Sequence, residues 1–267
     1  MTRRFVVSDP HGHLDQLERA LHTAGLTTAD GDWVGQDARL WFLGDFFDRG
    51  PDGVGVLELV RRLAGQAATG TGEVRALLGN HEILALGMHK FGTTEVPHEG
   101  ILRRSFERSW TLNGGMDSDQ ARLTEEHVDW LLDLPMVAVD GDYLLMHSDN
   151  HEYLHWGGSI DEINATARTE LHSDDLLVWW EIWRRMTARY AFRGPDGPLV
   201  ASELLNRLGG RRIVHGHSII ADMLGLEPAE VTGPLLYADG LALGVDAGAY
   251  DGGPCLVVEL EPLTAPA

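Results

Sequence analysis

Cysteine is almost absent from this 267-residue chain, in which Cys255 is the only one. No intramolecular disulfide can form, and a structural zinc site built from several thiolates is excluded. No apolar run approaches the roughly 18–20 residues that a helix needs to span a bilayer. The first thirty residues do not resemble a signal peptide, because the segment 5–7 is too short for its apolar part. We therefore expect a cytoplasmic protein with no membrane partner, in which Cys255 is a small core residue.

Basic residues are also scarce, since 21 Lys and Arg stand against 41 Asp and Glu, a net charge of −20 at pH 7. Such a surface repels nucleic acid backbones and anionic lipid, so we expect no nucleic acid partner and disfavour a nuclease. Most of the acidic excess is expected to solvate the surface. An anionic substrate would need local positive charge, which bound cations can supply.

The rest of the composition is that of a globular protein, with 43% hydrophobic and 23% charged residues. The length suits one substantial domain, which we expect to span residues 1–267. In the first ninety residues, apolar strand-like segments at 5–8, 40–43 and 74–78 alternate with helical patterns. This alternation predicts crossover connections, a largely parallel sheet and an α/β fold.

Two helical stretches interrupt the later part of the chain, at about 100–134 and 159–198, with a predicted strand at 143–146 between them. Further strands are predicted at 212–214, 241–245 and 256–260, and a turn at 194–198. We interpret the helical stretches as insertions that cap a catalytic α/β core. Trp179, Trp180 and Trp183 have helical spacing, which favours cap core; if exposed, they would form a stacking platform instead.

Polar residues follow five of the predicted strands, at the point where each strand ends. The five segments are Asp9-Pro10-His11, Gly44-Asp45-Phe46-Phe47-Asp48-Arg49-Gly50, Gly79-Asn80-His81-Glu82, His147-Ser148-Asp149 and His215-Gly216-His217. Ligands bind at the carboxyl ends of strands in open α/β sheets, so these groups are expected to converge. Taken singly, Asp9 is also a possible helix N-cap, Asp45, Asp48 and Asn80 are possible turn residues, and Arg49 is a possible partner of a carboxylate.

The donor atoms in these segments suit divalent metals. Carboxylate oxygen and imidazole nitrogen bind manganese, iron and zinc. Two metals about 3.5–4 Å apart need a shared anionic bridge. Asp45 is the obvious bridge, because Gly44 before it allows close backbone approach.

The first three segments, followed by His147 and by Gly216-His217-Ser218, resemble in this order the motif set of calcineurin-like metallophosphoesterases. They are most similar to the phosphoprotein phosphatase branch, which includes Ser/Thr protein phosphatases, phage lambda phosphatase, Shewanella-like phosphatases and diadenosine tetraphosphatase. The resemblance implies two packed mixed β-sheets flanked by helices, with helical cap insertions. Where eukaryotic members carry His-Gly-Gly, this chain has His147-Ser148-Asp149, closer to phage and bacterial members.

The resemblance also implies roles for single residues. It implies two bound divalent metal ions, for which manganese is favoured and iron, zinc, nickel and magnesium are alternatives. The implied metal ligands are Asp9 and His11 for the first ion, Asp45 as the bridge, and Asn80, His147 and His217 for the second ion. His81 is the implied general acid, with Asp48 orienting its ring and favouring its protonated form, and Arg49 is the implied phosphate clamp.

Several neighbouring residues stay open. A second phosphate-binding arginine is expected before the last motif; Arg184 is favoured over Arg185, Arg189 and Arg193 because it follows Trp183. His151 with Glu152 and His155 either contacts substrate or lies in solvent. His13 is taken as a bystander, Glu82 as a support of the helix start, and His215 as a weaker ligand candidate than His217.

The sequence therefore predicts a metal-dependent phosphatase that hydrolyses phosphate monoesters of a phosphoprotein or small metabolite, with a hydroxide bridging the metals as nucleophile. A dinucleoside polyphosphate or nucleotide pyrophosphohydrolase is the alternative. A metal-binding regulatory protein without catalysis is a third hypothesis. Retention of His81, Asp48 and Arg49 argues against it, because metal binding requires neither an acid nor a phosphate clamp.

Overall fold

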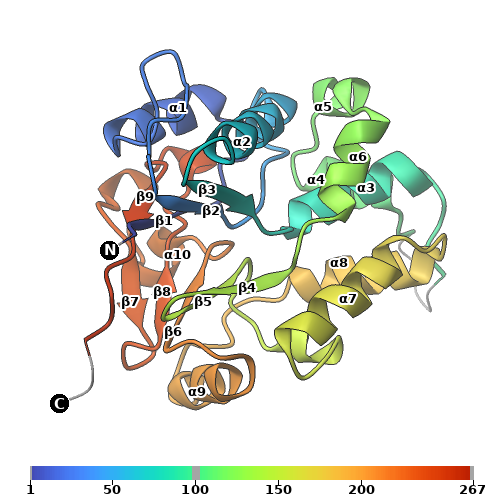
Figure 1. Ribbon diagram of the computed structural model, residues 1–267. Helices are drawn as coiled ribbons and strands as arrows, with labels where there is room; N and C mark the ends of the chain where they lie inside the picture. The colour runs from blue at the N-terminus through green and yellow to red at the C-terminus, as the bar shows by residue number, and fades with distance from the viewer. Residues whose placement is uncertain (1, 98–102, 265–267) are drawn as a thin grey trace.

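Two mixed sheets, packed against each other, form the centre of the computed structural model, which describes residues 2–97 and 103–264 (Figure 1). The first sheet has the order β3-β2-β1-β9. Its strands are β1 (Arg4–Val7), β2 (Arg39–Phe42), β3 (Glu73–Ala76) and β9 (Val257–Glu259). The strands β1, β2 and β3 pair in parallel, which confirms the prediction for the first ninety residues, and β9 is antiparallel to β1.

The second sheet has the order β4-β5-β6-β8-β7. Its strands are β4 (Val137–Asp140), β5 (Tyr143–Met146), β6 (Arg212–His215), β7 (Leu235–Tyr237) and β8 (Ala242–Gly244). The three inner strands are parallel, and the two edge strands are antiparallel to their neighbours. The sequence had not predicted β4 or β7.

The side chains of the strands alternate between two apolar layers. Val6 and Trp41 of the first sheet meet Leu145 and Val214 of the second sheet in the layer between them. Their neighbours Phe5, Val7, Leu40 and Phe42 point the other way, into the core beneath helices α1 (Leu14–Thr23) and α2 (Gly53–Ala67). Full burial of such a side chain contributes about 1.5–3 kcal/mol, so a one-residue shift in register would cost several of these contributions.

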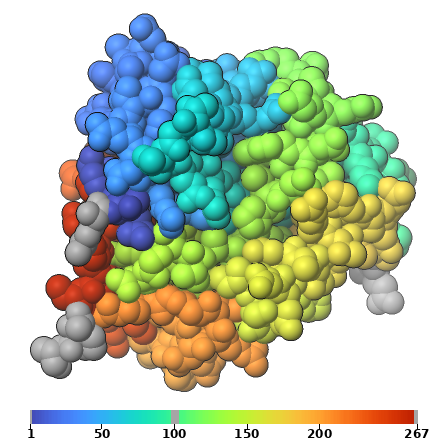
Figure 2. All heavy atoms as spheres, viewed as in Figure 1, coloured from blue at the N-terminus to red at the C-terminus, as the bar shows by residue number. Residues whose placement is uncertain are grey.

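Most of the remaining helices gather at one side of the two sheets. They are α3 (Asn80–Phe91), α4 (Phe106–Leu112), α5 (Asp117–Arg122), α6 (Glu125–Leu132), α7 (Ile160–Leu171) and α8 (Leu176–Met186). Both α4 and α8 pack on α3. Figure 2 shows the green segment with α5 and α6 beside the yellow segment with α7 and α8. Residues 100–102 of the first predicted helical stretch lie outside the described residues.

The predicted turn at 194–198 is partly wrong. Gly197 begins helix α9 (Gly197–Leu208), which lies beneath the second sheet in Figure 1, with Pro198 in its first turn. Proline is tolerated there because the N–H that it lacks would have no partner within the helix. A short helix α10 (Ile220–Leu224) and the 3-10 turns η1 (Glu152–His155), η2 (Pro228–Glu230) and η3 (Ala249–Asp251) complete the chain. Within the described ranges, no helix is long and apolar enough to cross a membrane.

The cap tryptophans belong to a shared aromatic cluster. Trp179 is 1% exposed and meets Phe91 edge-on, with ring centroids 5.8 Å apart. Trp180 and Trp183 are half-buried, and both rings contact Phe106. This packing agrees with the interpretation of these residues as cap core.

Cys255 is expected to be unreactive in the folded protein. Its thiol is buried, and burial raises its pKa to about 12, so almost none is thiolate at pH 8. Because thiolate is the reactive form, we expect a disulfide reagent to react at least about 100-fold more slowly with the native protein than with the urea-unfolded chain. Equal rates in the two states would contradict the buried placement.

Candidate metal centre and active site

The six ligands expected from the sequence lie together at the carboxyl ends of five strands. Asp9 and His11 follow β1, Asp45 follows β2, Asn80 follows β3, His147 follows β5 and His217 follows β6. Each of them is at most 5% exposed. Possible ligand atoms form two groups, and within each group all of them lie within 4.8 Å of one another. The first group consists of His11, Asp45 and His81, and the second of Asp45, His147 and His217. Asp45 is shared by both groups, as a bridging carboxylate would be.

The backbone at the site is held in an unusual conformation. Positive φ values occur at Asp9 (52°), His11 (41°), Asp45 (58°), Asp48 (69°), Arg49 (67°) and His217 (63°). Outside glycine, such a conformation costs on the order of 1–3 kcal/mol per residue, and it persists only where surrounding contacts enforce it. The strain therefore marks this part of the chain as a candidate functional site.

Glu82 supplies one of the contacts that enforce this geometry. Its buried carboxylate accepts hydrogen bonds from the backbone N–H groups of Asp45 (2.8 Å), Phe46 (2.6 Å) and Gly79 (2.8 Å). The carboxylate thereby holds the loop after β2 against the start of α3. This is the supporting role that the sequence predicted for Glu82, because Gly79 is the N-cap of α3.

Three histidines have fixed tautomers. The Nδ1 atoms of His11 and His147 lie 2.8 Å from the carbonyl oxygens of Phe47 and Leu43, and Nε2 of His217 lies 3.1 Å from the carbonyl oxygen of Thr187. A carbonyl oxygen only accepts, so each of these nitrogens carries the proton. The other ring nitrogen then has a free lone pair, the arrangement that metal-binding histidines usually show.

The lone pairs of His147 and His11 lie near other acceptor atoms, although that of His11 also faces a donor of Arg49. Nε2 of His147 lies 2.8 Å from Oδ1 of Asn80 and 3.3 Å from Oδ1 of Asp45, and Nε2 of His11 lies 3.6 Å from Oδ2 of Asp45. Acceptors that face one another with no proton between them repel, and a cation between them removes the repulsion. The donor set of oxygen and imidazole nitrogen therefore fits two divalent ions.

Burial disfavours the charged form of two carboxyl groups at the site, those of Asp9 and Asp45. Burial raises the pKa of Asp9 and of Asp45 to about 7, although Asp9 also accepts a hydrogen bond from the backbone N–H of His217. Cations bound beside them would reverse this shift, because opposite charge favours the carboxylate form.

His81 and Asp48 form a hydrogen-bonded pair beside the ligand groups. Nδ1 of His81 lies 2.7 Å from Oδ2 of Asp48, as expected for a carboxylate that orients the ring. Oδ1 of Asp48 accepts a second hydrogen bond from Nε1 of Trp110, at 2.9 Å. Sequence reasoning missed Trp110, because nothing in the local pattern of α4 indicates that its indole reaches the loop after β2.

The environment of His81 in the folded chain opposes the protonated form that the sequence predicts. Burial, followed by the positive charge of Arg49, lowers the pKa of His81 well below its ordinary value. Burial also raises the pKa of Asp48 to about 7, which weakens this carboxylate as a counter-charge. In the protein without bound metal or substrate, desolvation and neighbouring cations therefore outweigh the influence that the sequence predicts for Asp48.

Arg49 lies over the site. Its Nη1 is 3.0 Å from Nε2 of His11, and its Nη2 is 3.1 Å from Nε2 of His81. The guanidinium carbon lies 4.1 Å from the centroid of the Tyr250 ring, a cation–π contact. The side chain thus presents a fork of donors where an anionic group could bind.

The structure does not bring Arg184 to this site. Both of its donor groups bind the carboxylate of Glu181 at 2.8 Å, and its side chain is 53% exposed. Burial is the main cause of the lowered pKa of His81 and His217, and the charge of Arg189 contributes to the lowering in both. Arg189 is therefore the candidate whose charge acts on His81 and His217. His151 is exposed, at the start of η1.

Other residues weighed from the sequence fall outside the ligand groups. His215 uses Nδ1 toward the carbonyl oxygen of Gly216 (2.9 Å) and Nε2 toward the hydroxyl of Tyr237 (2.8 Å), so its ring belongs to the packing of the second sheet. His13 is only partly buried, and its Nε2 has no partner within the described ranges.

Two buried carboxylates near the site were not assigned a role from the sequence. Asp149 accepts hydrogen bonds from the hydroxyl of Ser218 (2.5 Å) and the backbone N–H of Tyr190 (3.0 Å), which ties the Arg189–Tyr190 segment to the residue after His217. Asp246 follows β8, and its pKa is raised well above the ordinary value, first by burial and then by the charge of Asp9. The rule applied to the other strand ends would have identified Asp246.

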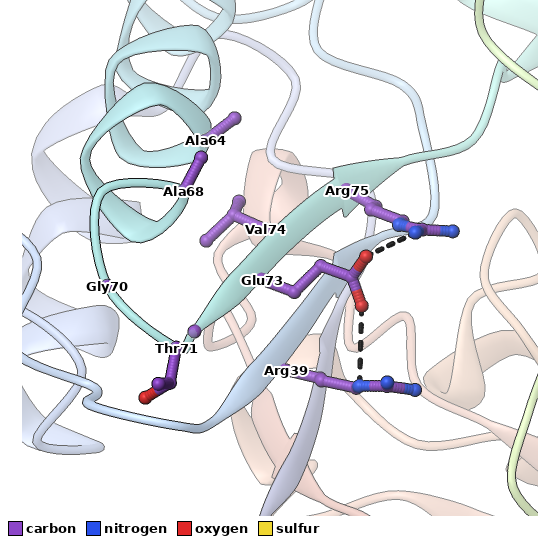
Figure 3. A pocket seen from close by; sticks show the side chains of 9 residues that line it. Arg39, Ala64, Ala68, Gly70, Thr71, Glu73, Val74 and Arg75 are labelled. Atoms are coloured by element: carbon purple, nitrogen blue, oxygen red, sulfur yellow. Dashed lines mark ion pairs between the residues drawn. The ribbon is translucent and has the colours of Figure 1, made fainter.

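A cavity of ≈ 460 Å³ lies far from this chemistry. Its lining includes Arg39 and Glu73, the first residues of β2 and β3, and therefore lies at the opposite end of these strands from Asp45 and Asn80. Figure 3 shows Glu73 between Arg39 and Arg75, with an ion pair to each. Arg39 also pairs with Asp140, so both arginines have carboxylate partners, and we assign no function to this cavity.

Comparisons with known proteins agree with the geometry. The model of the calcineurin-like phosphoesterase family matches residues 2–220. Shewanella-like protein phosphatase 2 of Arabidopsis thaliana is 30% identical over 82 residues, which cover 31% of this chain and 21% of that protein. A symmetrical bis(5'-nucleosyl)-tetraphosphatase of Dechloromonas aromatica is 26% identical over 144 residues, which cover 54% of this chain and 42% of that protein.

Among solved structures, a cold-active protein tyrosine phosphatase of a psychrophilic Shewanella species has the same fold. The TM-score is 0.70 at 22% identity, and the similarity covers 98% of this chain and 76% of that chain. The two sequence relatives are matched over less than half of their own length. The similarity at this level establishes the arrangement of sheets and helices.

Proposed function

The chain belongs to the calcineurin-like phosphoesterase family, and from this we propose that it is a metal-dependent phosphatase that hydrolyses phosphate monoesters. The observation that carries the proposal is that two groups of possible ligands share Asp45, and that beside them lie the Asp48 carboxylate, hydrogen-bonded to His81 of the first group, and the Arg49 fork. A protein that only bound metal would need neither of the last two.

The residues that would hold two divalent ions are those predicted from the sequence. Asp9 and His11 would bind the first, Asn80, His147 and His217 the second, and Asp45 both. When bound, such ions lower the pKa of water and neutralise the charge of phosphate oxygens. We expect manganese to serve best, with iron, zinc, nickel and magnesium as alternatives for these oxygen and nitrogen donors.

The chain itself would hold the phosphate and protonate the leaving oxygen. Arg49 would turn its donors from the two imidazoles to phosphate oxygens, a bidentate contact that the guanidinium geometry favours. That movement frees Nε2 of His81 and removes a positive charge from it. A phosphate dianion beside the ring also raises the pKa of His81, so that it can act as the general acid.

Arg189 is expected to contribute to substrate binding, and Arg184 is not. Arg189→Ala should lower kcat/KM by about tenfold to 100-fold, since a hydrogen bond to a charged group contributes about 1.5–3 kcal/mol. Arg184→Ala removes an exposed helix pair with Glu181 and should change kcat/KM less than about twofold. Steady-state kinetics of both variants test this, and a larger loss in Arg184→Ala would restore the assignment made from the sequence.

A dinucleoside polyphosphate hydrolase is the second candidate. The match to the symmetrical tetraphosphatase of Dechloromonas aromatica, which covers 54% of this chain, favours it. Both activities would use the same proposed metal ligands and the same Arg49, and would differ in the group that leaves.

A substrate panel tests the proposal. The metal-loaded protein is incubated with an aryl phosphate, phosphoserine, phosphothreonine and phosphotyrosine peptides, sugar phosphates and diadenosine tetraphosphate, and phosphate release is compared as kcat/KM. The proposal requires the highest value with one of the monoesters. A preference of more than about 100-fold for diadenosine tetraphosphate, equivalent to about 2.7 kcal/mol, would establish the second candidate instead.

A further inference from the structure

We propose that Trp110 and Gly114, in the cap segment from α4 to α5, position the acid pair and the phosphate clamp of the active site. In this arrangement Trp110 fixes Asp48, and through it His81, while Gly114 fixes Arg49. Both are positioning residues, since they contact Asp48 and Arg49 and act through them. The inference rests on the proposed function, because it assigns the cap segment a part in that reaction.

Trp110 holds the carboxylate that orients His81. Its indole is 4% exposed, and Nε1 donates to Oδ1 of Asp48 at 2.9 Å, while Oδ2 of Asp48 meets Nδ1 of His81 at 2.7 Å. Asp48 has a positive φ of 69° and is fully buried, and these two hydrogen bonds fix the direction of its two carboxylate oxygens. Loss of the indole N–H would leave a buried carboxylate oxygen without this partner.

Gly114 holds Arg49 through its backbone. Its carbonyl oxygen accepts a hydrogen bond from the N–H of Arg49 at 2.7 Å. Gly114 has a φ of +86°, and a Cβ there would lie 2.9 Å from Cγ and 3.3 Å from Cα of Arg49. The position therefore requires glycine for both its conformation and its close approach.

The segment that carries both residues is anchored on either side of the site. At its start, Phe106 is fully buried, and its ring lies against Gly87 of α3, the helix that begins with Asn80 and His81. At its end, Asp119 accepts a hydrogen bond from the N–H of Val54 in α2 at 3.1 Å. The segment thus connects α3 to the start of α2, and the loop with Asp48 and Arg49 lies between these anchors.

Trp110→Phe is the first test. The variant keeps an aromatic ring and removes the N–H, so the acid should be misplaced while the metal ligands are untouched. We expect kcat for an alkyl phosphate to fall about tenfold, the effect of losing a hydrogen bond to a charged group. For an activated aryl phosphate, whose leaving oxygen needs little protonation, kcat should fall less than about threefold. The matched control is Trp33→Phe, since Nε1 of Trp33 has no partner in the described part of the chain.

Gly114→Ala is the second test, and it addresses Arg49. The added methyl group displaces the clamp, so the inhibition constant of inorganic phosphate should rise about tenfold, with a smaller change in kcat for the aryl ester. Gly225→Ala is the matched control, because Gly225 also has a positive φ (+67°) but has no atom within 4 Å of its Cβ position. An unchanged inhibition constant in Gly114→Ala would overturn the role of Gly114.

A third measurement needs no enzymatic activity. In the metal-free protein labelled with 15N-tryptophan, the indole resonance of Trp110 is identified by its loss in Trp110→Phe. Asp48→Asn should shift that resonance and leave the Trp33 resonance in place, because Trp110 is the one tryptophan among the described residues whose indole donates to Asp48. No shift, or equal losses of kcat on both esters in Trp110→Phe, would overturn the role of Trp110. Inactivity of the wild-type protein with every metal would instead refute the proposed function, and the resonance test would still decide the contact.

Discussion

Asp45→Asn is expected to lower kcat/KM for phosphate release at least about a thousandfold, or about 4 kcal/mol, while the chain remains folded. Asp45 is the one residue shared by both ligand groups, with Oδ2 3.6 Å from Nε2 of His11 and Oδ1 3.3 Å from Nε2 of His147. An amide has the same shape but no charge, so the bridge between two cations is lost. Metal content after dialysis should fall from two ions per chain to one or none.

Asp140→Asn provides the control for this experiment. Asp140 is also a buried carboxylate, but it pairs with Arg4 and Arg39 at the edge of the sheets away from the ligand groups. This variant should lose stability and keep both metal ions and its kcat. If Asp45→Asn bound two ions and kept its activity, the shared-carboxylate arrangement would not describe the working site.

His81→Ala is expected to separate substrates by their leaving groups. General acid catalysis contributes about 10²–10⁴-fold, so an alkyl phosphate or a phosphoserine peptide should lose turnover in this range. An activated aryl phosphate expels a stable oxyanion without a proton and should lose much less. The measurement is kcat for a series of esters with increasing leaving-group pKa, whose slope should become more negative in the variant.

The control for His81→Ala is His127→Ala. His127 is buried in α6, where its ring takes part in a capping box with Thr124, and the variant should keep the leaving-group slope of the wild type. Equal losses across the ester series in His81→Ala would refute the acid role and leave His81 as a residue that only packs against His11, from which its ring centroid is 4.6 Å away.

The candidate residues that the structure brings together are those that follow buried strands. Apolar segments such as 40–43 and 143–146 are recognisable because both faces of a central strand are covered. The polar residues after them must meet at one end of the sheet, however the connecting helices are packed. Asp45 and His147 could therefore be brought together from the sequence before any contact was known.

What escaped the sequence depends on contacts between distant segments. Arg184 and Arg189 have similar sequence surroundings. In the structure, Arg184 lies within α8, which ends at Met186, whereas Arg189 lies beyond it and next to Tyr190, which has a positive φ. The bond between Trp110 and Asp48 joins residues 62 apart in the chain. The hairpin of β4 and β5 was missed although Gly141-Asp142 between them is a usable turn signal.

The lowered pKa of His81 also escaped prediction. A carboxylate partner is visible in the motif, but the extent of burial and the placement of the Arg49 charge are properties of the folded chain. A carboxylate partner raises the pKa of a histidine, whereas burial and a neighbouring positive charge lower it. The balance depends on exposure and distance, neither of which the motif specifies.

Stepwise loading of the metal-free protein with Mn²⁺ tests the central claim most directly. Phosphate release from an aryl phosphate and a phosphopeptide is measured against the number of ions bound per chain. Two ligand groups joined by Asp45 predict that activity rises until two equivalents are bound and then stays constant. The claim would be contradicted if the protein bound two ions of manganese, iron, zinc, nickel or magnesium and still released no phosphate from any substrate of the panel.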